Sequence, residues 1–445
     1  MKRCLYILLL LLSSCSVAKK QPEWTLQQPF DNGYYSAVVK IPKKAPNYKE
    51  LARNDAIREI STQISVQIDS DIALTETEAN GIPSSELISN IRSSSNNKIR
   101  DLQLVGTYET KNDFWAYYRL SKSEYYAWRK NQCDQAVAQA LNLLNEFDLS
   151  QANLTSGISA LLKGLELIVD YTDMDLTTNY RNKQINLYNE LFFRLNHLTE
   201  TVQIKYAKKE IDLIAKQRDR KSIAVFVNYQ QAGKEIPVNN FPVCFNFLSG
   251  KGEIVAKGLT DENGKAELIL NRITSFSTPQ FIEAKPDKDF WLTSIENPIV
   301  KTMFGNLPFL PATLKLNVHR PKAFVQYSFN NTSGTDYRNI LLKKLQDLDL
   351  EVSTNQNESD YTFKVNIITR NSEFLPLLKQ YSAVADAYIE LIDSHTGKSV
   401  YNTNLTGIKS VAVTPDIAKG KNELDAVNEL CDKVMFMLVQ QYIMY

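Results

Sequence analysis

The sequence lacks the residue groupings on which most catalytic and metal sites depend. Its 445 residues include only three histidines, His197, His319 and His395, and no two of them have the spacing of metal ligands. There is no G-x-S-x-G turn, no phosphate-binding P-loop and no H-E-x-x-H helix. We therefore predict a protein that is not an enzyme and that needs neither a metal nor a cofactor.

A basic excess is also missing. The chain has 51 lysine and arginine residues against 50 aspartate and glutamate residues, and removal of Lys2 and Arg3 with a leader changes the balance to 49 against 50. Nucleic-acid binding depends on a basic excess or a basic patch, so no nucleic-acid partner is expected. With 43% apolar and 23% charged residues, the composition is that of a folded soluble protein of several domains.

No hydrophobic run is long enough to span a membrane. The run at residues 4–12 has nine residues, and a helix of that length, at about 1.5 Å per residue, covers less than half of a hydrocarbon core of roughly 30 Å. Lys2 and Arg3 precede the run and small residues follow it. This pattern predicts a secretory signal peptide over residues 1–14.

The end of this signal, Leu12-Ser13-Ser14-Cys15, resembles the lipobox of bacterial lipoproteins. The resemblance implies that Cys15 is acylated, each buried methylene contributing about 0.8 kcal/mol to membrane attachment. An ordinary signal cleaved nearby is the alternative. Residue 16, the second residue of the mature chain, is not the Asp that resembles the inner-membrane retention signal of lipoproteins. Residues 16–20 also lack the acidic cluster that resembles a surface-export signal. We therefore expect an outer-membrane lipoprotein that faces the periplasm. Residues 15–23 form its tether.

The remaining cysteines are few and far apart. Cys133, Cys244 and Cys431 leave one thiol unpaired, and none belongs to a C-x-x-C motif. We interpret all three as small buried hydrophobic residues. One disulfide between distant domains is the alternative in an oxidising compartment.

Residues 24–128 are predicted to form a small α+β domain. Residues 34–40 alternate as a strand does, and residues 48–68 place apolar side chains every four positions, as a helix does. The last five of these residues also alternate like a strand, so the end of the helix stays open. Two alternating runs on either side of an Asn-Asp turn predict a hairpin, with strands at residues 102–110 and 114–121.

A pattern of core and strand positions runs through this domain. It comprises Trp24, the Tyr34-Tyr35 strand, the Ala-rich helix ending in residues 60–66, and the aromatic hairpin strand of residues 115–120. The pattern resembles the Lpp-twenty family of bacterial outer-membrane lipoproteins. The resemblance covers about the first quarter of the mature chain and implies a small α+β domain on an envelope lipoprotein, with no catalytic motif.

Three further regions follow. Residues 129–221 have helical spacing and are predicted to be a helical region, in which the charged residues 205–221 form a solvated helix face. Residues 222–320 contain short alternating strands separated by Gly and Pro turns, which predicts an immunoglobulin-like β-sandwich. Residues 321–445 are predicted to form a C-terminal α+β domain, which makes the whole chain an α+β multidomain protein.

The C-terminal domain is expected to contain a small sheet with helices. Alternate residues of the stretch 382–392 are apolar, which places them on one buried face of a strand. The closing helix begins with Thr414 as N-cap and Pro415 at the first helical position. The residues that this helix is expected to bury are Leu424, Val427, Cys431, Val434, Leu438 and Tyr442.

Aromatic residues crowd the N-terminal domain. Alternation along the second hairpin strand places Trp115 and Tyr117 on the face opposite Phe114. Together with Tyr34 they are the candidate binding surface, because exposed Tyr and Trp are favoured at interfaces. The alternative is that they pack under the helix that follows.

Two other groupings contain the residue types of a hydrolase. Asp69 and Asp71 form a carboxylate pair, although we interpret them as solvating the end of a helix or strand. Asp393, Ser394 and His395 have the members of a triad, but neighbouring residues on a turn point in different directions, so a turn is the better interpretation.

These features together predict a non-enzymatic, lipid-anchored scaffold or partner-binding lipoprotein at the periplasmic face of the outer membrane. Its expected partner is an envelope protein, which crosslinking and mass spectrometry of whole envelopes would identify. A peptidoglycan- or glycan-binding protein is the first alternative. A carboxylate-dependent envelope hydrolase is the second.

Overall fold

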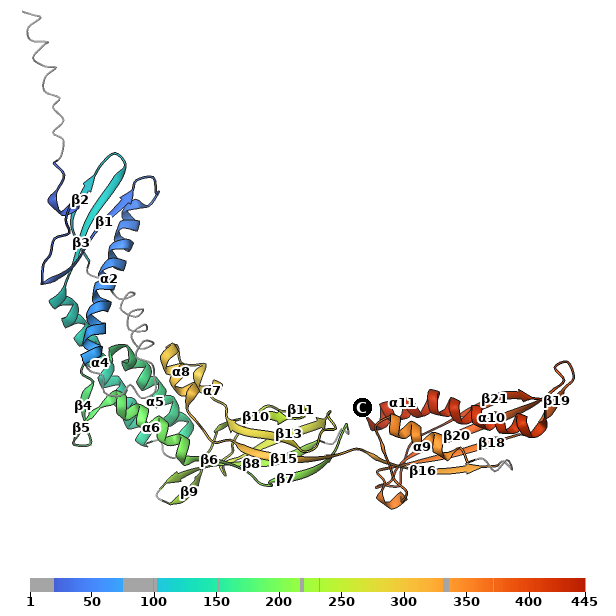
Figure 1. The fold of residues 1–445 in the computed structure, drawn as a ribbon. Helices are drawn as coiled ribbons and strands as arrows, with labels where there is room; N and C mark the ends of the chain where they lie inside the picture. The colour runs from blue at the N-terminus through green and yellow to red at the C-terminus, as the bar shows by residue number, and fades with distance from the viewer. Residues whose placement is uncertain are drawn as a thin grey trace, which may run out of the picture. The chain divides into compact units, whose positions relative to one another are not determined.

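The computed structural model describes residues 20–74, 99, 102–149, 153–216, 220–231, 233–330, 336–370 and 372–444, and gives no side-chain description for 67–74 and 149. The chain divides into two compact units: Met1–Thr199 with Lys288–Pro308, and Glu200–Asp287 with Phe309–Tyr445. Both contain helices and strands, so the protein is an α+β multidomain protein, as predicted (Figure 1). Within the described ranges no helix is long and apolar enough to cross a membrane.

The N-terminal domain is a three-stranded antiparallel sheet covered by one helix. The predicted strand and hairpin are confirmed, and the strand order is β1-β3-β2. The helix continues through residues 64–68, because Ile64 is buried while Val66 is 63% exposed, as helical spacing requires. The elements are β1 (Tyr34–Pro42), α2 (Tyr48–Leu74), β2 (Gln103–Glu109) and β3 (Asp113–Ser121), preceded by the 3₁₀ turn η1 (Glu23–Thr25).

The core of this domain lies between the sheet and α2. Ala52 and Ala56 are fully buried, and their small side chains allow the helix to lie close to the sheet. Phe114, Ala116 and Tyr118 point into the same core from β3, as the alternation of the strand predicts. The opposite face of β3 therefore carries Trp115 and Tyr117, the candidate surface residues.

The helical region of this unit begins directly after β3. Its first helix starts at Lys122 and runs across the expected boundary between residues 128 and 129. The Ser121 hydroxyl accepts a hydrogen bond from the Glu124 N–H at 3.3 Å, which supports the start of the helix. The elements are α4 (Lys122–Leu149), α5 (Leu154–Ile168), η2 (Val169–Tyr171), the hairpin β4 (Thr177–Tyr180) and β5 (Lys183–Asn186), and α6 (Leu187–Thr201).

A segment from the predicted sandwich region packs in this first unit. Lys288–Pro308 was expected within the β-sandwich of residues 222–320, but it forms α7 (Asp289–Leu292) and α8 (Pro298–Asn306) and belongs with Met1–Thr199. Trp291 is 2% exposed, and its indole N–H donates to the Thr155 carbonyl at 3.0 Å. Burial of this large aromatic side chain gives the segment a strong attachment to α5.

A carboxylate on α5 holds the loop before α8. Oε1 of Glu166 accepts hydrogen bonds from the N–H of Asn297 at 2.9 Å and from the N–H of Glu296, and Lys163 Nζ lies 2.8 Å from Oε2. Burial alone would raise the pKa of Glu166, but these donors outweigh it and lower the pKa. The ionised carboxylate therefore stabilises the attachment of the segment.

The second unit begins with a β-sandwich, as predicted, in which strands begin at Lys221, Pro242 and Lys265. The prediction of a solvated helix over residues 205–221 was wrong, because this stretch contains the last two residues of β6 (Val202–Tyr206) and all of β7 (Glu210–Ile214). Val202, Ile204 and Leu213 are buried, so the charged residues occupy the outward positions of strands. One sheet has the order β12-β10-β14-β15-β7 and the other β11-β13-β8-β6, with β9 paired to β8.

The remaining sandwich strands are short and regular. The Asp261 carboxylate accepts hydrogen bonds from the N–H groups of Asn263 and Lys265, both at 2.9 Å, and Gly264 has φ +69°, so residues 261–264 form a tight turn before β13. The strands are β8 (Lys221–Gln231), β9 (Lys234–Pro237), β10 (Pro242–Ser249), β11 (Gly252–Ile254), β12 (Lys257–Leu259), β13 (Lys265–Ile273), β14 (Gln280–Pro286) and β15 (Ala312–His319).

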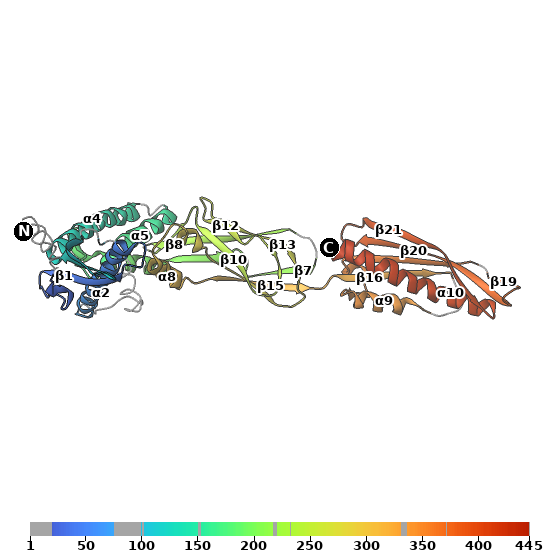
Figure 2. The same cartoon turned by 90° about the horizontal axis from the view of Figure 1, so that it is seen from above.

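The C-terminal domain is a six-stranded mixed sheet with helices on one face (Figure 2). The strand order is β17-β16-β18-β20-β19, and β21 also pairs with β20. Its elements are β16 (Lys322–Phe329), α9 (Arg338–Asp347), β17 (Glu351–Val352), η3 (Gln356–Glu358), β18 (Tyr361–Thr369), β19 (Glu373–Leu375), β20 (Gln380–Asp393), β21 (Ser399–Ala412) and α10 (Pro415–Glu429), which continues as η4 (Leu430–Met435), α11 (Phe436–Leu438) and η5 (Val439–Ile443).

The closing helix follows the sequence prediction at its start and departs from it at its end. The Thr414 hydroxyl accepts a hydrogen bond from the Ile417 N–H at 3.3 Å, which confirms the N-cap. Leu424 is only half-buried, and Tyr442 is 38% exposed, with its ring 5.0 Å from that of Tyr401. The other four predicted core residues of this helix are buried.

Candidate functional site

The outward face of the C-terminal sheet is the most distinctive surface of the described residues. Its strands bury one face against α9 and α10, where Ala387, Ile389 and Leu391 are at most 2% exposed. Because side chains alternate along a strand, the residues between them face the other side. The described residues of α9 and α10 in the domain's core pack against the buried face of the sheet.

Eight polar side chains occupy the middle of this outward face. The strand registers place them in two rows that each cross β16, β18, β20 and β21. Three strand spacings of about 4.8 Å make each row about 14 Å wide. We call these residues the polar face: Gln326, Lys364, Glu390 and Asn402 in one row, and Ser328, Asn366, Tyr388 and Asn404 in the other.

The polar face is hollowed and accessible. Its residues line a depression of about 660 Å³. Seven of them are exposed, including Tyr388 at 41%, while Glu390 is half-buried. The depression is thus open to a ligand that lies across the strands, with an aromatic ring available at its floor.

The charges in the polar face cancel. Lys364 Nζ lies 3.9 Å from a carboxylate oxygen of Glu390, so the only cation and the only anion of the polar face are paired. The remaining six side chains are uncharged: four amides, one hydroxyl and one phenol. A strongly charged ligand would find no net attraction here.

The amide groups give the polar face a particular hydrogen-bonding capacity. Each amide offers two donors and a carbonyl acceptor, and the hydroxyl and phenol groups both donate and accept. Within the face, the Ser328 hydroxyl lies 3.1 Å from Oδ1 of Asn366, which orients that amide. A ligand rich in hydroxyl and amide groups matches this arrangement, and an apolar ring face of such a ligand matches Tyr388.

The candidate surface predicted from the sequence lies on the N-terminal sheet, and the structure corrects part of it. Tyr117 is only 8% exposed, because the ring of Trp24 packs 5.9 Å from it. It therefore belongs to no open surface, and Trp24 rather than the following helix covers it. Trp115 and Tyr34 are half-buried.

Cations of the same domain already lie over the two half-buried rings. Lys40 Nζ is 5.2 Å from the ring centre of Trp115, and the Arg119 guanidinium is 4.3 Å from that of Tyr34. These contacts satisfy the faces of both rings within the domain. The N-terminal surface is consequently a weaker binding candidate than the polar face.

The histidines and the triad-like turn do not converge on a catalytic arrangement in the described residues. The Asp393 carboxylate accepts hydrogen bonds from the N–H of His395 and of Thr396, both at 2.9 Å, which confirms the turn. The His395 ring contacts Asp360 at 3.1 Å, while the Ser394 hydroxyl lies 3.1 Å from that of Ser359. The His395 ring thus pairs with Asp360 rather than with its sequence neighbours Asp393 and Ser394.

Metal and carboxylate sites give no further candidate. Across the described residues there is no group of three or more His, Cys, Asp or Glu side chains that could hold a metal ion. Asp69 and Asp71 lie on α2 where side chains are not described, and the predicted acylation site Cys15 precedes the first described residue. Those two predictions remain untested.

The three other cysteines are free thiols. Cys133 and Cys431 are buried, as predicted, whereas Cys244 is only half-buried. Burial raises the pKa of the Cys431 thiol to about 11. A thiol with this pKa is protonated and unreactive at neutral pH.

Comparisons with known proteins yield remote similarities. No protein-family model and no curated protein matches the chain. Among solved structures, the secreted protein HP1454 from Helicobacter pylori aligns with 91% of this chain and 100% of its own, at 10% identity and a TM-score of 0.22. Lipoprotein GNA1162 from Neisseria meningitidis aligns with 25% of this chain and 99% of its own, at 13% identity and a TM-score of 0.18.

A third similarity is to the D00-D0 domain of intimin, with 15% identity and a TM-score of 0.17. The similar region covers 27% of this chain and 48% of that intimin chain, so this chain spans about half of the intimin chain. At these TM-scores the similarities carry no argument about fold or function.

Proposed function

We propose that this chain is a non-enzymatic, lipid-anchored protein of the bacterial envelope that binds a glycan on the polar face of its C-terminal sheet. The observation that carries the binding function is the pair of cross-strand rows, with four amides and one exposed tyrosine in an open depression. Glycans present hydroxyl groups that both donate and accept hydrogen bonds, and sugar rings have apolar faces that stack on aromatic side chains.

The chemistry of the polar face favours a neutral or weakly charged polymer. The Lys364–Glu390 pair leaves no net charge to attract a polyanion. Rows about 14 Å wide are long enough for more than one sugar ring. A glycan strand of peptidoglycan, which carries both hydroxyl and acetamido groups, has this chemistry.

The anchor and the location rest on the sequence. The lipobox-like stretch ending at Cys15, and the pattern similar to the Lpp-twenty family, support a lipoprotein of the outer membrane with its domains in the periplasm. An acyl anchor at one end of a multidomain chain and a glycan-binding surface near the other end make a scaffold between membrane and cell wall. An envelope-protein partner remains a prediction from the sequence alone.

Pull-down with purified sacculi tests the binding function. The chain is produced from residue 16 onward and compared with a variant that carries Tyr388→Ala and Asn404→Ala. Each lost hydrogen-bonding or stacking contact is worth about 1 kcal/mol, so we expect affinity to fall about fivefold for each substitution.

Asn246→Ala is the matched control, because Asn246 is also an exposed asparagine in the middle of a strand, β10, away from the polar face. It should bind sacculi as the parent chain does. Failure of the parent chain to bind sacculi, or equal binding by the double variant and the control, would refute the assignment.

A further inference from the structure

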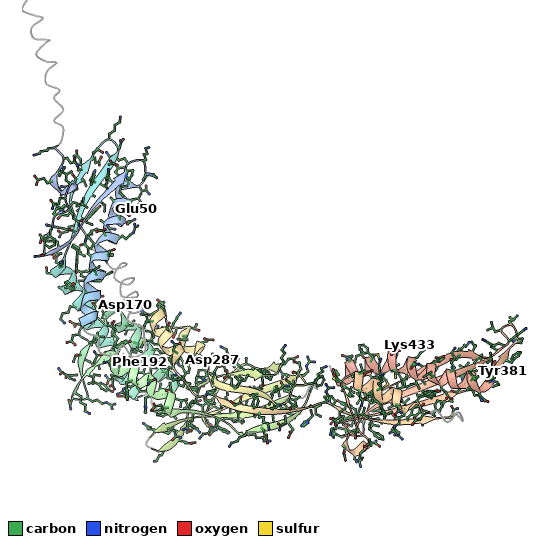
Figure 3. All side chains as sticks on the ribbon, in the orientation of Figure 1. Glu50, Asp170, Phe192, Asp287, Tyr381 and Lys433 are labelled. Atoms are coloured by element: carbon green, nitrogen blue, oxygen red, sulfur yellow. The ribbon has the colours of Figure 1, made fainter. Side chains whose placement is uncertain are left out.

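The hairpin that ends the C-terminal sheet has an unusual turn. Phe374 on β19 pairs with Tyr381 on β20, which lies at this end of the sheet in Figure 3, and the Leu378 N–H donates to the Leu375 carbonyl at 3.2 Å. The turn between the strands reads Leu-Pro-Leu-Leu, followed by Lys379 with φ +53°. Pro376 is an ordinary turn residue, but Gly, Asn, Asp and Ser are usual at the other turn positions, so backbone geometry does not explain the two leucines Leu377 and Leu378.

These apolar side chains are exposed. Leu377 is 99% exposed, Leu378 61% and Phe374 50%. Next to them, Tyr381 pairs with Ala412, which brings the exposed Val413 and Ile417, at the start of the closing helix, to the same end of the sheet (Figure 1). Clustered exposed apolar side chains of this kind mark interaction surfaces. We call the five residues the apolar tip: Phe374, Leu377, Leu378, Val413 and Ile417.

The charges around the apolar tip are mainly positive. The two stretches that carry it, residues 372–381 and 409–421, contain four lysines against two acids. Within the described part of the chain, none of these lysines lies within ion-pair distance of an acidic side chain. The four lysines are Lys379, Lys409, Lys419 and Lys421, and the two acids are Glu373 and Asp416.

We propose that the apolar tip inserts into a lipid surface that carries negatively charged headgroups. A small group of apolar side chains at a hairpin end can enter the boundary between headgroups and acyl chains, and unpaired lysines around it are attracted by anionic lipid. The net positive charge distinguishes this surface from the polar face, where the charges cancel. The inference is independent of acylation at Cys15 and of glycan binding.

Vesicle co-sedimentation tests the proposal. The chain is produced from residue 16 onward, so that neither the leader nor an acyl chain contributes. It should sediment with vesicles that contain phosphatidylglycerol, bind phosphatidylcholine vesicles more weakly, and lose the difference at high salt. Loss of one fully inserted leucine lowers partitioning about tenfold, so Leu377→Ser with Leu378→Ser should reduce binding at least tenfold.

Leu310→Ser is the matched control, because Leu310 is 75% exposed and lies outside the apolar tip. It should bind vesicles as the parent chain does. A further variant with Lys379→Gln and Lys421→Gln should keep binding to neutral vesicles but lose the preference for phosphatidylglycerol. Equal binding by the leucine variant and the Leu310 control overturns the proposal. So does a parent chain that binds no vesicle.

Discussion

Replacing Trp291 by alanine should destabilise the first unit and leave the second unchanged. A buried tryptophan side chain removes about 200 Å² from water, which at about 25 cal/mol per Å² corresponds to about 5 kcal/mol. The Thr155 carbonyl that accepts the indole N–H also accepts the Ser159 hydroxyl at 3.2 Å, so the substitution orphans no buried acceptor. With partial relaxation of the cavity we expect a loss of about 3–5 kcal/mol in the free energy of unfolding.

Tryptophan fluorescence is a selective assay for this loss. All four tryptophans, Trp24, Trp115, Trp128 and Trp291, belong to the first unit, so fluorescence during urea unfolding follows that unit alone. With an m-value of about 2 kcal/mol per molar urea, a loss of about 4 kcal/mol moves the midpoint down by about 2 M. Hydrogen exchange of β20 and β21 reports on the second unit and should not change.

Phe290 provides the control for this experiment. It lies next to Trp291 in sequence, packs edge-on against its ring at 5.5 Å, and is 49% exposed. Phe290→Ala should cost about 1 kcal/mol or less, because little of its surface is buried. An unchanged fluorescence midpoint in the Trp291 variant, or a loss of protection in β20 and β21 instead, would show that Lys288–Pro308 is not part of the first unit.

Two further substitutions test the anchor and the α5–α8 attachment. Cys15→Ser should abolish labelling by radioactive palmitate and block processing of the leader; unchanged labelling would contradict acylation at Cys15. The pKa of Glu166 is lower in the folded protein than its unfolded value of about 4.3. Its contribution to the free energy of unfolding is therefore complete above about pH 4.3, and it is lost as the pH falls through the folded pKa. In the Glu166→Gln variant, the free energy of unfolding measured by tryptophan fluorescence should therefore fall less at acid pH than in the parent chain. An equal fall in both proteins would refute this.

Elements with one buried face were predictable from the sequence because their periodicity is local. The buried apolar residues of α2 recur every four residues from Ala52 to Ile64, and the apolar residues of β20 recur every second residue, so each pattern specifies both the element and its buried side. The Thr414-Pro415 pair specifies a helix start through backbone chemistry alone. In these cases the physical cause lies within a few neighbouring residues.

The wrong predictions share a non-local cause. Strands β6 and β7 have five residues each, so their alternating apolar pattern is too short to stand out among the charged residues on their outward faces. They form strands because β6 pairs with β8 and β7 pairs with β15. The attachment of Lys288–Pro308 depends on Trp291 meeting Thr155, 136 positions earlier in the chain. No local pattern encodes a contact at that separation.

The polar face could not be predicted from the sequence, because its residues are spread over four strands. Each strand alone displays only a fragment of it: two polar residues two positions apart, such as Asn402 and Asn404 on β21. The fragments become a surface only when β16 pairs parallel with β18, and β20 pairs antiparallel with both β18 and β21. Outward positions of a sheet are free of packing constraints, and lysine, glutamate or threonine would keep them soluble. Three asparagines, which are depleted in strands, and one glutamine at such positions therefore support the proposed hydrogen-bonding surface.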